Sequence, residues 1–443
     1  MPWLPVALSM YASLTSATTY LALPGKAFSE NISLILVSIV SPCVAPLLIF
    51  LFYPFYRRLN VTTSYEYIEL RFGRPARLCV SALFLCARLG WLGAVIYAPA
   101  LALTVVTGLP LAPCILFMGV MATVYTALGG LAAVLWTDVV QFIVLVTGAI
   151  WLACSLILGV DGGIGGILET ASAAGHLHIA RWNFSFVETT GVMVVVCFFF
   201  QMMNDYGTDQ VTVQRLMAVK KDSGVWKAIV FNACSDFFII SLLLFVGLGI
   251  FVFYQQHGIT VGPGFSPDQI MPHYIIRALP NGVSGLLIAA IFAAAMSSMD
   301  SGIHSMATVI EHDFAGKSRK ETVRMARVLV LVLGSIATGL AFYVAKIDDI
   351  IEAFATFISL FSAPILALFL LGMLTRRGSF AAWLMAAVPA IALTYWLQTS
   401  TDVNWTYYFP TSFALTLTGA ALLSLVLPGQ PADPKLTVFG STT

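Results

Sequence analysis

The stretch AAAMSSMDSGIHSMATV, residues 293–309, lies inside a long apolar segment, yet it carries four serines, an aspartate and a histidine. An aspartate at the centre of a membrane helix costs about 2.5–3.5 kcal/mol on insertion scales, so a compensating interaction is expected. The polar residues recur with the spacing of one helical face: Ser297, Asp300, Ser301, His304, Ser305 and Thr308. The pattern predicts a membrane helix with an oxygen-bearing stripe that lines a site.

The composition around this stretch is that of a membrane protein. The chain has 443 residues, of which 59% are hydrophobic and only 10% charged, whereas soluble domains are about 25% charged. About 20 apolar residues are needed to span a bilayer. Twelve segments reach that length, near 3–22, 33–54, 79–105, 111–128, 135–158, 189–208, 228–254, 282–311, 325–345, 350–373, 379–398 and 407–427. The sequence therefore predicts an all-α, polytopic protein with the lipid bilayer as its surroundings.

The placement of basic residues predicts the orientation of these spans. Most Lys and Arg residues follow even-numbered spans: Arg57, Arg58, Arg71, Arg74, Arg77, Arg215, Lys220, Lys221, Lys227, Lys317, Arg319, Lys320, Arg324, Arg327, Arg376, Arg377 and Lys435. Loops rich in Lys and Arg remain in the cytoplasm. We therefore expect a multi-pass protein of the cell (inner or plasma) membrane with both termini inside.

Two spans carry signs of an interrupted helix. In the stretch 6–28, which covers most of the first span, residues 12–19 form a small and hydroxyl-rich run. In the stretch 198–221, where the sixth span ends, the sequence becomes polar from Gln201 onward. Unwound backbone beside a cavity explains both runs. Close helix packing through small residues remains an alternative for the first run, and exit from the membrane remains one for the sixth.

The interruptions occupy corresponding positions if spans 1–5 and 6–10 form two halves. An odd number of spans gives the halves opposite topology, as in inverted-repeat transporters. We expect a ten-helix core over 1–373, with halves at about 1–160 and 187–373. Two accessory helices would follow at 374–430, then a short tail at 431–443.

Asp138 begins the apolar run of the fifth span, after Trp136 and Thr137. It is either a solvated helix cap or a carboxylate that faces the polar stripe around Asp300. In the second case, carboxylate and serine oxygens suit a hard cation such as Na⁺, and H⁺ is the other candidate because a buried aspartate can titrate.

Three of these stretches resemble the sodium/solute symporter family: ALGGLAAVLWTDVVQ (127–141), TDQVTVQR (208–215) and IFAAAMSSMDSGIHSMATV (291–309). The resemblance covers nearly the whole chain. It implies a LeuT-like 5+5 inverted repeat with two C-terminal helices, and Na⁺-coupled import of a small organic solute. Members of the family usually have one more helix before the core, whereas the printed chain starts almost at the core.

The resemblance also implies two sodium sites. The main one would use backbone carbonyls of the first core helix together with the eighth: Ala12, Thr15, Ala294, Ser297 and Ser298. A second one would combine Asp138 with Ser297, Asp300 and Ser301.

Candidate substrate contacts follow from the same resemblance. Ser16 and Thr19 match substrate positions of the sialic acid members. Those members place a glutamine where Ser38 stands and an arginine where Trp91 stands, with Arg88 about one turn earlier. The polar sixth segment adds these candidates: Asn204, Thr208 and Asp209.

Residues 95–109 and 266–272 look more like the branch that carries monocarboxylates, vitamins and iodide. A monocarboxylate or vitamin-like anion is therefore the leading substrate expectation, and a sugar or sialic acid is the alternative. H⁺ coupling and a non-transporting membrane sensor are less favoured.

Other function classes lack support in the sequence. The chain has no HExxH, no Gly-Xaa-Ser-Xaa-Gly and no Cys-Xaa-Xaa-Cys pattern, so an enzyme is not expected. We expect Na⁺ as coupling ion, no organic cofactor, no nucleic-acid partner and no obligate protein partner.

Overall fold

The computed structural model describes residues 2–59, 61, 63–128, 131–262, 265–314, 322–347, 349–427 and 429–439, without the side chains of 131–136, 281, 322 and 323. Within these ranges the regular structure is entirely helical. Lys317, Arg319 and Lys320, which contributed to the predicted orientation, lie outside the described residues.

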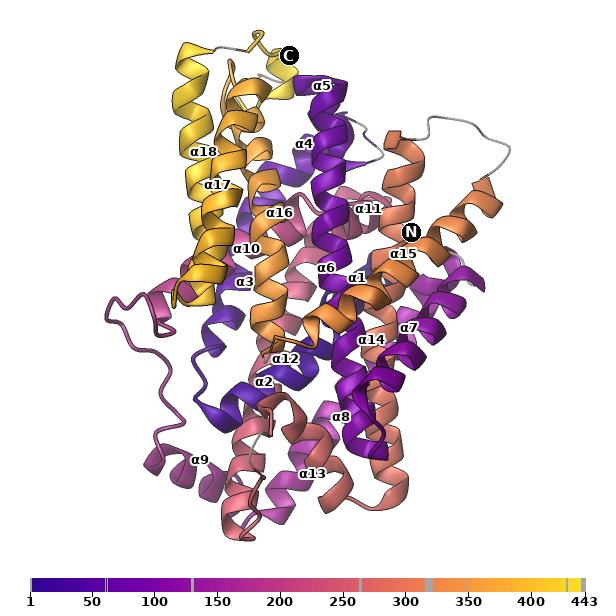
Figure 1. Cartoon of the computed structure of the whole chain (residues 1–443), viewed down its shortest axis with the longest axis vertical. Helices are drawn as coiled ribbons and strands as arrows, with labels where there is room; N and C mark the ends of the chain where they lie inside the picture. Colours follow the sequence, from indigo (N-terminus) through magenta and orange to yellow (C-terminus); the bar gives the residue numbers. More distant parts are fainter. Residues whose placement is uncertain are drawn as a thin grey trace.

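The helices form one elongated bundle (Figure 1). Their bounds in the first half are α1 (Trp3–Leu14), α2 (Ala17–Ser29), α3 (Ile35–Leu47), η1 (Leu48–Phe52), α4 (Tyr53–Leu59), α5 (Ser64–Phe72), α6 (Arg74–Thr107), α7 (Leu111–Leu128), α8 (Leu131–Gly159) and α9 (Gly163–Ala173). The second half has α10 (Gly191–Gly207), α11 (Gln210–Met217), α12 (Asp222–Gln256), η2 (Pro267–Gln269), α13 (Ile270–Ala278), α14 (Asn281–Val309), η3 (Ile310–Phe314), α15 (Thr322–Val344) and α16 (Ile350–Leu374). At the end follow α17 (Phe380–Ser400), η4 (Trp405–Tyr407), α18 (Tyr408–Val426) and η5 (Pro434–Leu436).

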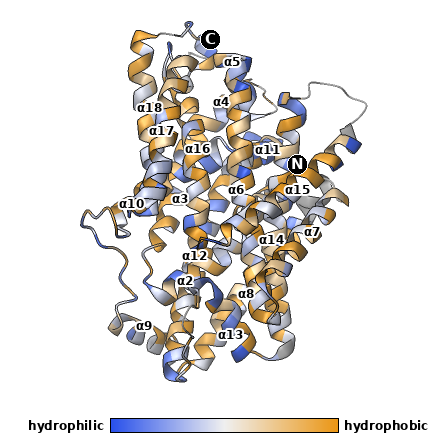
Figure 2. Ribbon diagram, viewed as in Figure 1, coloured by the Kyte–Doolittle hydropathy of each residue, from blue (hydrophilic) through white to orange (hydrophobic). Residues whose placement is uncertain are grey.

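Each of the twelve expected spans corresponds to described helices. Ten helical runs are long and apolar enough to cross a membrane, and two shorter apolar helices, Trp3–Leu14 and Gly191–Gly207, begin the first and sixth spans. Large apolar side chains face outward, such as Phe50 at 80% exposure and Leu158 at 87%. Figure 2 shows hydrophobic residues along α17 and α18. The prediction of a polytopic helical membrane protein is confirmed.

The first span is broken between α1 and α2. Thr15 and Ser16 adopt extended backbone conformations, and the Ser16 hydroxyl caps α2 by accepting a hydrogen bond from Thr18 N at 3.2 Å. The last carbonyls of a helix have no intrahelical donor, so this break leaves the carbonyls of Ala12 and Ser13 available to other groups.

The sixth span is broken in the same way between α10 and α11. Asp209 is extended and caps α11, accepting from Val211 N at 2.9 Å. Two tyrosines of α4 donate to carbonyls at the end of α10: Tyr53 to Tyr206 O at 2.6 Å and Tyr56 to Gly207 O at 2.7 Å. Both interruptions expected from the sequence are therefore present, and the hydroxyls compensate for the lost helical bonds.

The basic loops meet at one end of the bundle. Arg58, after α4, donates to Lys435 O at 2.8 Å, and Arg71, in α5, donates to Thr375 O at 3.0 Å. Trp3 lies against Gly224 at the start of α12. Figure 1 shows α5 and the C-terminus together at this end, while α9 and α13 lie at the opposite end. The C-terminus lies with the loops after α4 and α5, and the start of α1 lies beside the start of α12.

Candidate sodium and substrate sites

The broken end of α1 lies directly against α14. Ser297 donates from its hydroxyl to Ala12 O at 2.7 Å and to Ala294 O at 3.0 Å, and Ser298 donates to Ser13 O at 3.1 Å. Four of the five residues predicted for the main sodium site therefore lie together. Thr15 directly follows α1, and in the described part of the chain no hydrogen bond joins it to α14.

The donor set at this crossing fits Na⁺. It consists of neutral hydroxyl and carbonyl oxygens, which are the ligands that hard monovalent cations accept. No group of three or more His, Cys, Asp or Glu side chains is placed to hold a metal ion in the described part of the chain. The crossing of α1 and α14 is thus suited to a weakly held alkali cation rather than to a transition metal.

The predicted second sodium site already contains a guanidinium group. Asp138 is fully buried, accepts from the Ser9 hydroxyl at 2.7 Å, and lies 3.5 Å from Arg215 Nη2. The same Arg215 nitrogen donates to the Ser301 hydroxyl at 2.6 Å, and the Ser13 hydroxyl lies 2.8 Å from Ser301. Arg215 thus bridges Asp138 and Ser301, so Asp138 is a buried ion-pair partner and not a solvated cap.

Asp300 directly precedes Ser301 on α14 but is bonded elsewhere. Thr126 of α7 donates to one of its carboxylate oxygens, and the other oxygen, Oδ2, is buried without a hydrogen-bond partner. Nε2 of His304 on the same helix is also buried and unpartnered. The stripe that opened the sequence analysis is therefore present, but its residues face three neighbours: α1, α7 and α11.

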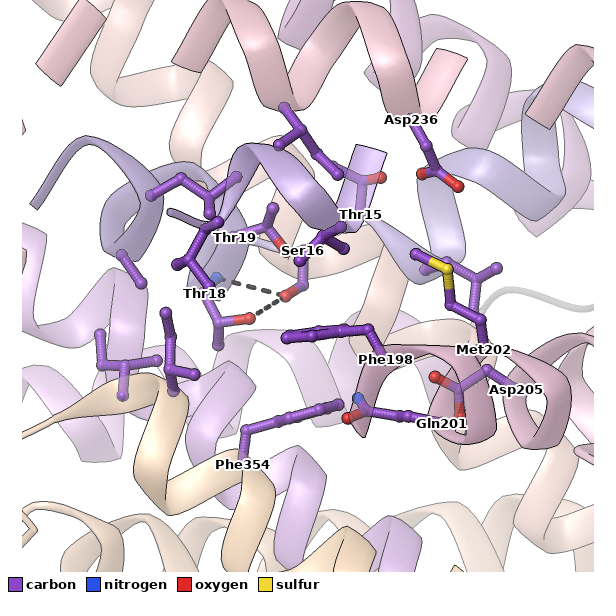
Figure 3. Close-up of a pocket in the computed structure, with 18 of the residues that line it drawn as sticks. Thr15, Ser16, Thr18, Thr19, Phe198, Gln201, Met202, Asp205, Asp236 and Phe354 are labelled. Atoms are coloured by element: carbon purple, nitrogen blue, oxygen red, sulfur yellow. Dashed lines mark hydrogen bonds between the residues drawn. The ribbon is translucent and has the colours of Figure 1, made fainter. Parts of the chain in front are cut away.

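A cavity of about 180 Å³ lies at the two helix breaks (Figure 3). Most of its wall is apolar or aromatic, including Trp91, Phe198 and Phe354. Its polar lining residues are Tyr11, Thr15, Ser16, Thr18, Thr19, Gln201, Asp205, Tyr206 and Asp236. The wall also includes Leu34 at the start of α3 and Ile350 at the start of α16, so the cavity extends toward the end opposite the basic loops.

Three of the predicted substrate residues line this cavity: Ser16, Thr19 and Trp91. The structure does not bring the other four to its wall. Ser38 donates to Ile35 O of its own helix at 2.6 Å, and Thr208 donates to the Asn204 amide oxygen at 2.9 Å. Asp209 is occupied by Arg88 and by capping α11. Thr208 and Asp209 lie at the α10–α11 break, where their side chains bond to the end of α10 and the start of α11.

Arg88 is turned away from the cavity. Its guanidinium forms a two-point ion pair with Asp209, with Nη2–Oδ1 at 2.6 Å and Nε–Oδ2 at 3.1 Å. Its carbon Cζ lies 4.6 Å from the centre of the Trp91 ring. Trp91 lines the cavity, whereas Arg88 packs on the Trp91 ring and is not among the lining residues.

A cluster of charged residues lies next to the cavity, on the side away from the basic loops. Lys26 of α2 forms an ion pair with Asp349, the cap of α16, at 2.7 Å. Asp268, in the loop segment η2, accepts a hydrogen bond from Ile350 N at 3.2 Å. Burial, together with the nearby Asp349 carboxylate, raises the pKa of Asp268 to about 7. These contacts join α2, η2 and α16 next to the cavity lining.

Sequence reasoning missed several of these residues. Ser9, Ser13 and Arg215 complete the Asp138 network, and Asp205 and Asp236 supply the carboxylates of the cavity. Asp205 was visible as part of a polar run, and Asp236 as an acid inside an apolar span. The sequence around Asp205 and Asp236 does not show that they face one cavity, because the cavity is built from helices that are distant in the sequence.

Comparison with known proteins bears directly on this arrangement. The model of the sodium:solute symporter family matches residues 1–386. The chain belongs to the sodium:solute symporter family. The sequence-based resemblance is therefore confirmed, as is the LeuT-like fold of two inverted five-helix repeats with two further helices.

Individual symporters show how similar this chain is to its relatives. The sodium/sialic acid symporter NanT of Aliivibrio fischeri is 31% identical over 90% of this chain and 81% of its own length. Sodium-coupled monocarboxylate transporter 2 of Mus musculus is 30% identical over 89% of this chain and 65% of its own length.

Among solved structures, a substrate-bound, outward-open Na⁺-coupled sialic acid symporter superposes with a TM-score of 0.88. It is 26% identical, over 98% of this chain and 91% of that one. This protein is therefore a multi-pass, sodium-coupled solute transporter.

Proposed function

We propose that this symporter uses Na⁺ to import a small sugar-like solute through the cavity at the two helix breaks. The observation that carries the proposal is the hydrogen bond of Ser297 to Ala12 O across α14 and α1. It supports the proposal because these candidate sodium ligands lie at the end of the helix whose next residues, Thr15 and Ser16, line the cavity.

The proposed coupling follows from this adjacency. Na⁺ bound between α1 and α14 would replace the serine hydrogen bonds and hold the broken end of α1 in place. Because Thr15 and Ser16 directly follow the end of α1 and line the cavity, Na⁺ binding would raise the affinity for solute, and solute would raise the affinity for Na⁺ by the same factor. A membrane potential of 100 mV adds about 2.3 kcal/mol for each charge moved.

The sugar or sialic acid alternative now has more support than the monocarboxylate expectation. The sialic acid relatives match over 81% and 91% of their own lengths, against 65% for the monocarboxylate transporter. The hydroxyl groups in the otherwise mostly apolar wall, such as those of Ser16, Thr18 and Thr19, also suit a hydroxylated solute.

We also propose the domain division and orientation read from the sequence. Residues 1–373 would form the transport core, with halves at about 1–160 and 187–373. Residues 374–430 would be accessory helices and 431–443 a cytoplasmic tail. The end that holds the basic loops and both termini would face the cytoplasm of a cell membrane.

Purified protein in NaCl and in KCl tests the proposal. A ligand that binds only the folded state raises the melting temperature, so Na⁺ alone should stabilise the protein, and a sugar-like solute should add a shift only in Na⁺. In proteoliposomes the same solute should accumulate when a Na⁺ gradient is imposed. Equal melting temperatures in both salts, with uptake independent of Na⁺, would rule out Na⁺ coupling.

A further inference from the structure

The cavity has an unusual charge for a site expected to hold an organic anion. Asp205 of α10 and Asp236 of α12 both line it, and the described lining residues include no Lys, Arg or His. Figure 3 shows both carboxylates on one side of the cavity, across from Ser16 and Thr18. The described wall therefore presents two carboxyl groups and no basic side chain to a bound solute.

Neither carboxylate forms an ion pair with a protein cation in the part of the chain that the structure describes. Asp236 accepts only from hydroxyls, Ser41 at 2.6 Å and Tyr206 at 3.1 Å. Asp205 accepts from the Asn204 amide at 3.1 Å and remains half-buried. A carboxylate removed from water is costly unless it is paired, so a positive group on the ligand would stabilise a carboxylate of this cavity.

Arg88 interacts with the charge of Asp205, but it forms its ion pair with Asp209. Two bonds join this pair, and the guanidinium packs on the Trp91 ring. An anion that paired with Arg88 would have to break this buried ion pair, which leaves Asp209 unpaired.

Aromatic residues supply a second and independent feature of cation recognition. Trp91, Phe198 and Phe354 line the same cavity as the two carboxylates. Aromatic faces attract cations within about 6 Å, and they also pack against the apolar faces of sugar rings.

We infer that the solute carries an ammonium group: Asp205 and Asp236 select a hydroxylated amine, of the amino-sugar class, over a carboxylate. This inference rests on the proposed function for its Na⁺ dependence, but the charge preference is a property of the cavity itself. It separates this chain from relatives whose names specify sialic acid, an anion.

Three sugars that differ in charge test the preference: glucosamine as the cation, N-acetylglucosamine as the neutral analogue and N-acetylneuraminic acid as the anion. Binding to the purified full chain is followed by tryptophan fluorescence, because Trp91 lies in the cavity wall, and by melting temperature. Each titration is done in NaCl and in KCl. We expect glucosamine to bind at least about tenfold more tightly than the other two.

Asp205→Asn tests the residue, since it keeps the shape and the hydrogen-bond acceptor but removes the charge. It should weaken glucosamine binding about tenfold or more and leave N-acetylglucosamine unchanged. Asp161→Asn is the matched control, because Asp161 is an exposed acid at the outer end of α8, away from the cavity. Should Asp205→Asn fail to fold, Asp236→Asn is measured instead, with the same expectation.

The outcomes separate the two proposals. Na⁺-dependent binding of N-acetylneuraminic acid in preference to glucosamine would overturn the amine inference and keep the Na⁺-coupled function. Glucosamine binding that is equal in NaCl and KCl would keep the inference and count against Na⁺ coupling. Glucosamine affinity unaffected by both Asp205→Asn and Asp236→Asn, or no glucosamine binding at all, would overturn the inference.

Discussion

Arg215 Nη2 lies 3.5 Å from the Asp138 carboxylate, although the two residues belong to α11 and α8 and are both buried. The same nitrogen donates to Ser301 on α14. A cation from the protein thus lies between two residues that the sequence suggested as Na⁺ ligands. The two roles of Asp138, ion-pair partner and Na⁺ ligand, predict different consequences of its mutation.

Asp138→Asn should lower the stability of the protein strongly. Removing one partner of a buried ion pair costs about 3–5 kcal/mol because the other charge stays buried. The melting temperature should therefore fall, and the double variant Asp138→Asn, Arg215→Met should recover part of the loss. A variant with an unchanged melting temperature and a much weaker Na⁺ dependence of uptake would instead make Asp138 a direct Na⁺ ligand.

Ser297→Ala should raise the Na⁺ concentration for half-maximal uptake about tenfold, which corresponds to about 1.4 kcal/mol. The change removes a hydroxyl that bridges α14 to Ala12 O of α1. Ser305→Ala is the matched control because Ser305 is equally buried on α14 but donates to Gly302 O of its own helix. Similar Na⁺ dependence in both variants and the unmodified chain would contradict the site assignment.

The ionisation of Asp268 should lower the free energy of unfolding as the pH rises. An aspartate in an unfolded chain titrates near about 3.9, whereas burial raises the pKa of Asp268 in the folded protein to about 7. Between these values the folded state binds more protons than the unfolded state, so the free energy of unfolding decreases with increasing pH.

The measurement is the melting temperature of the unmodified protein minus that of Asp268→Asn, at pH 5 and at pH 8. Asn keeps an oxygen that can accept from Ile350 N but does not ionise. The difference should be larger at pH 5 than at pH 8. A difference that is constant with pH, or that grows toward pH 8, would show that Asp268 ionises without cost in the folded state.

Gly247→Ala should destabilise the protein by about 1–3 kcal/mol. An added Cβ at Gly247 in α12 would lie 2.4 Å from Pro24 O and 2.8 Å from the Ala27 side chain, both in α2. Gly339→Ala in α15 is the control, since nothing lies within 4 Å of its added Cβ. Thermal denaturation in detergent should show a lower melting temperature for Gly247→Ala and an unchanged one for Gly339→Ala. Equal melting temperatures for the two variants would mean that α2 can move away from α12 without cost.

The sequence alone determined the fold class, the twelve spans and the positions of both helix breaks. These features depend on local chemistry: the length of apolar runs, the clustering of small and hydroxyl residues, and the charge of the loops. The resemblance to the family also indicated Ala12, Ala294, Ser297 and Ser298, and the packing of α1 against α14 brings these four residues together.

The partners of the charged residues were decided only by the tertiary structure. Asp209 and Arg88 are far apart in sequence, yet the packing of α6 beside the α10–α11 break makes them a buried pair. That pairing removes the cation from the cavity and leaves Asp205 and Asp236 to set its charge. A buried charge acts through what lies within a few ångströms of it, and no local pattern in the sequence records which distant helix supplies that neighbour.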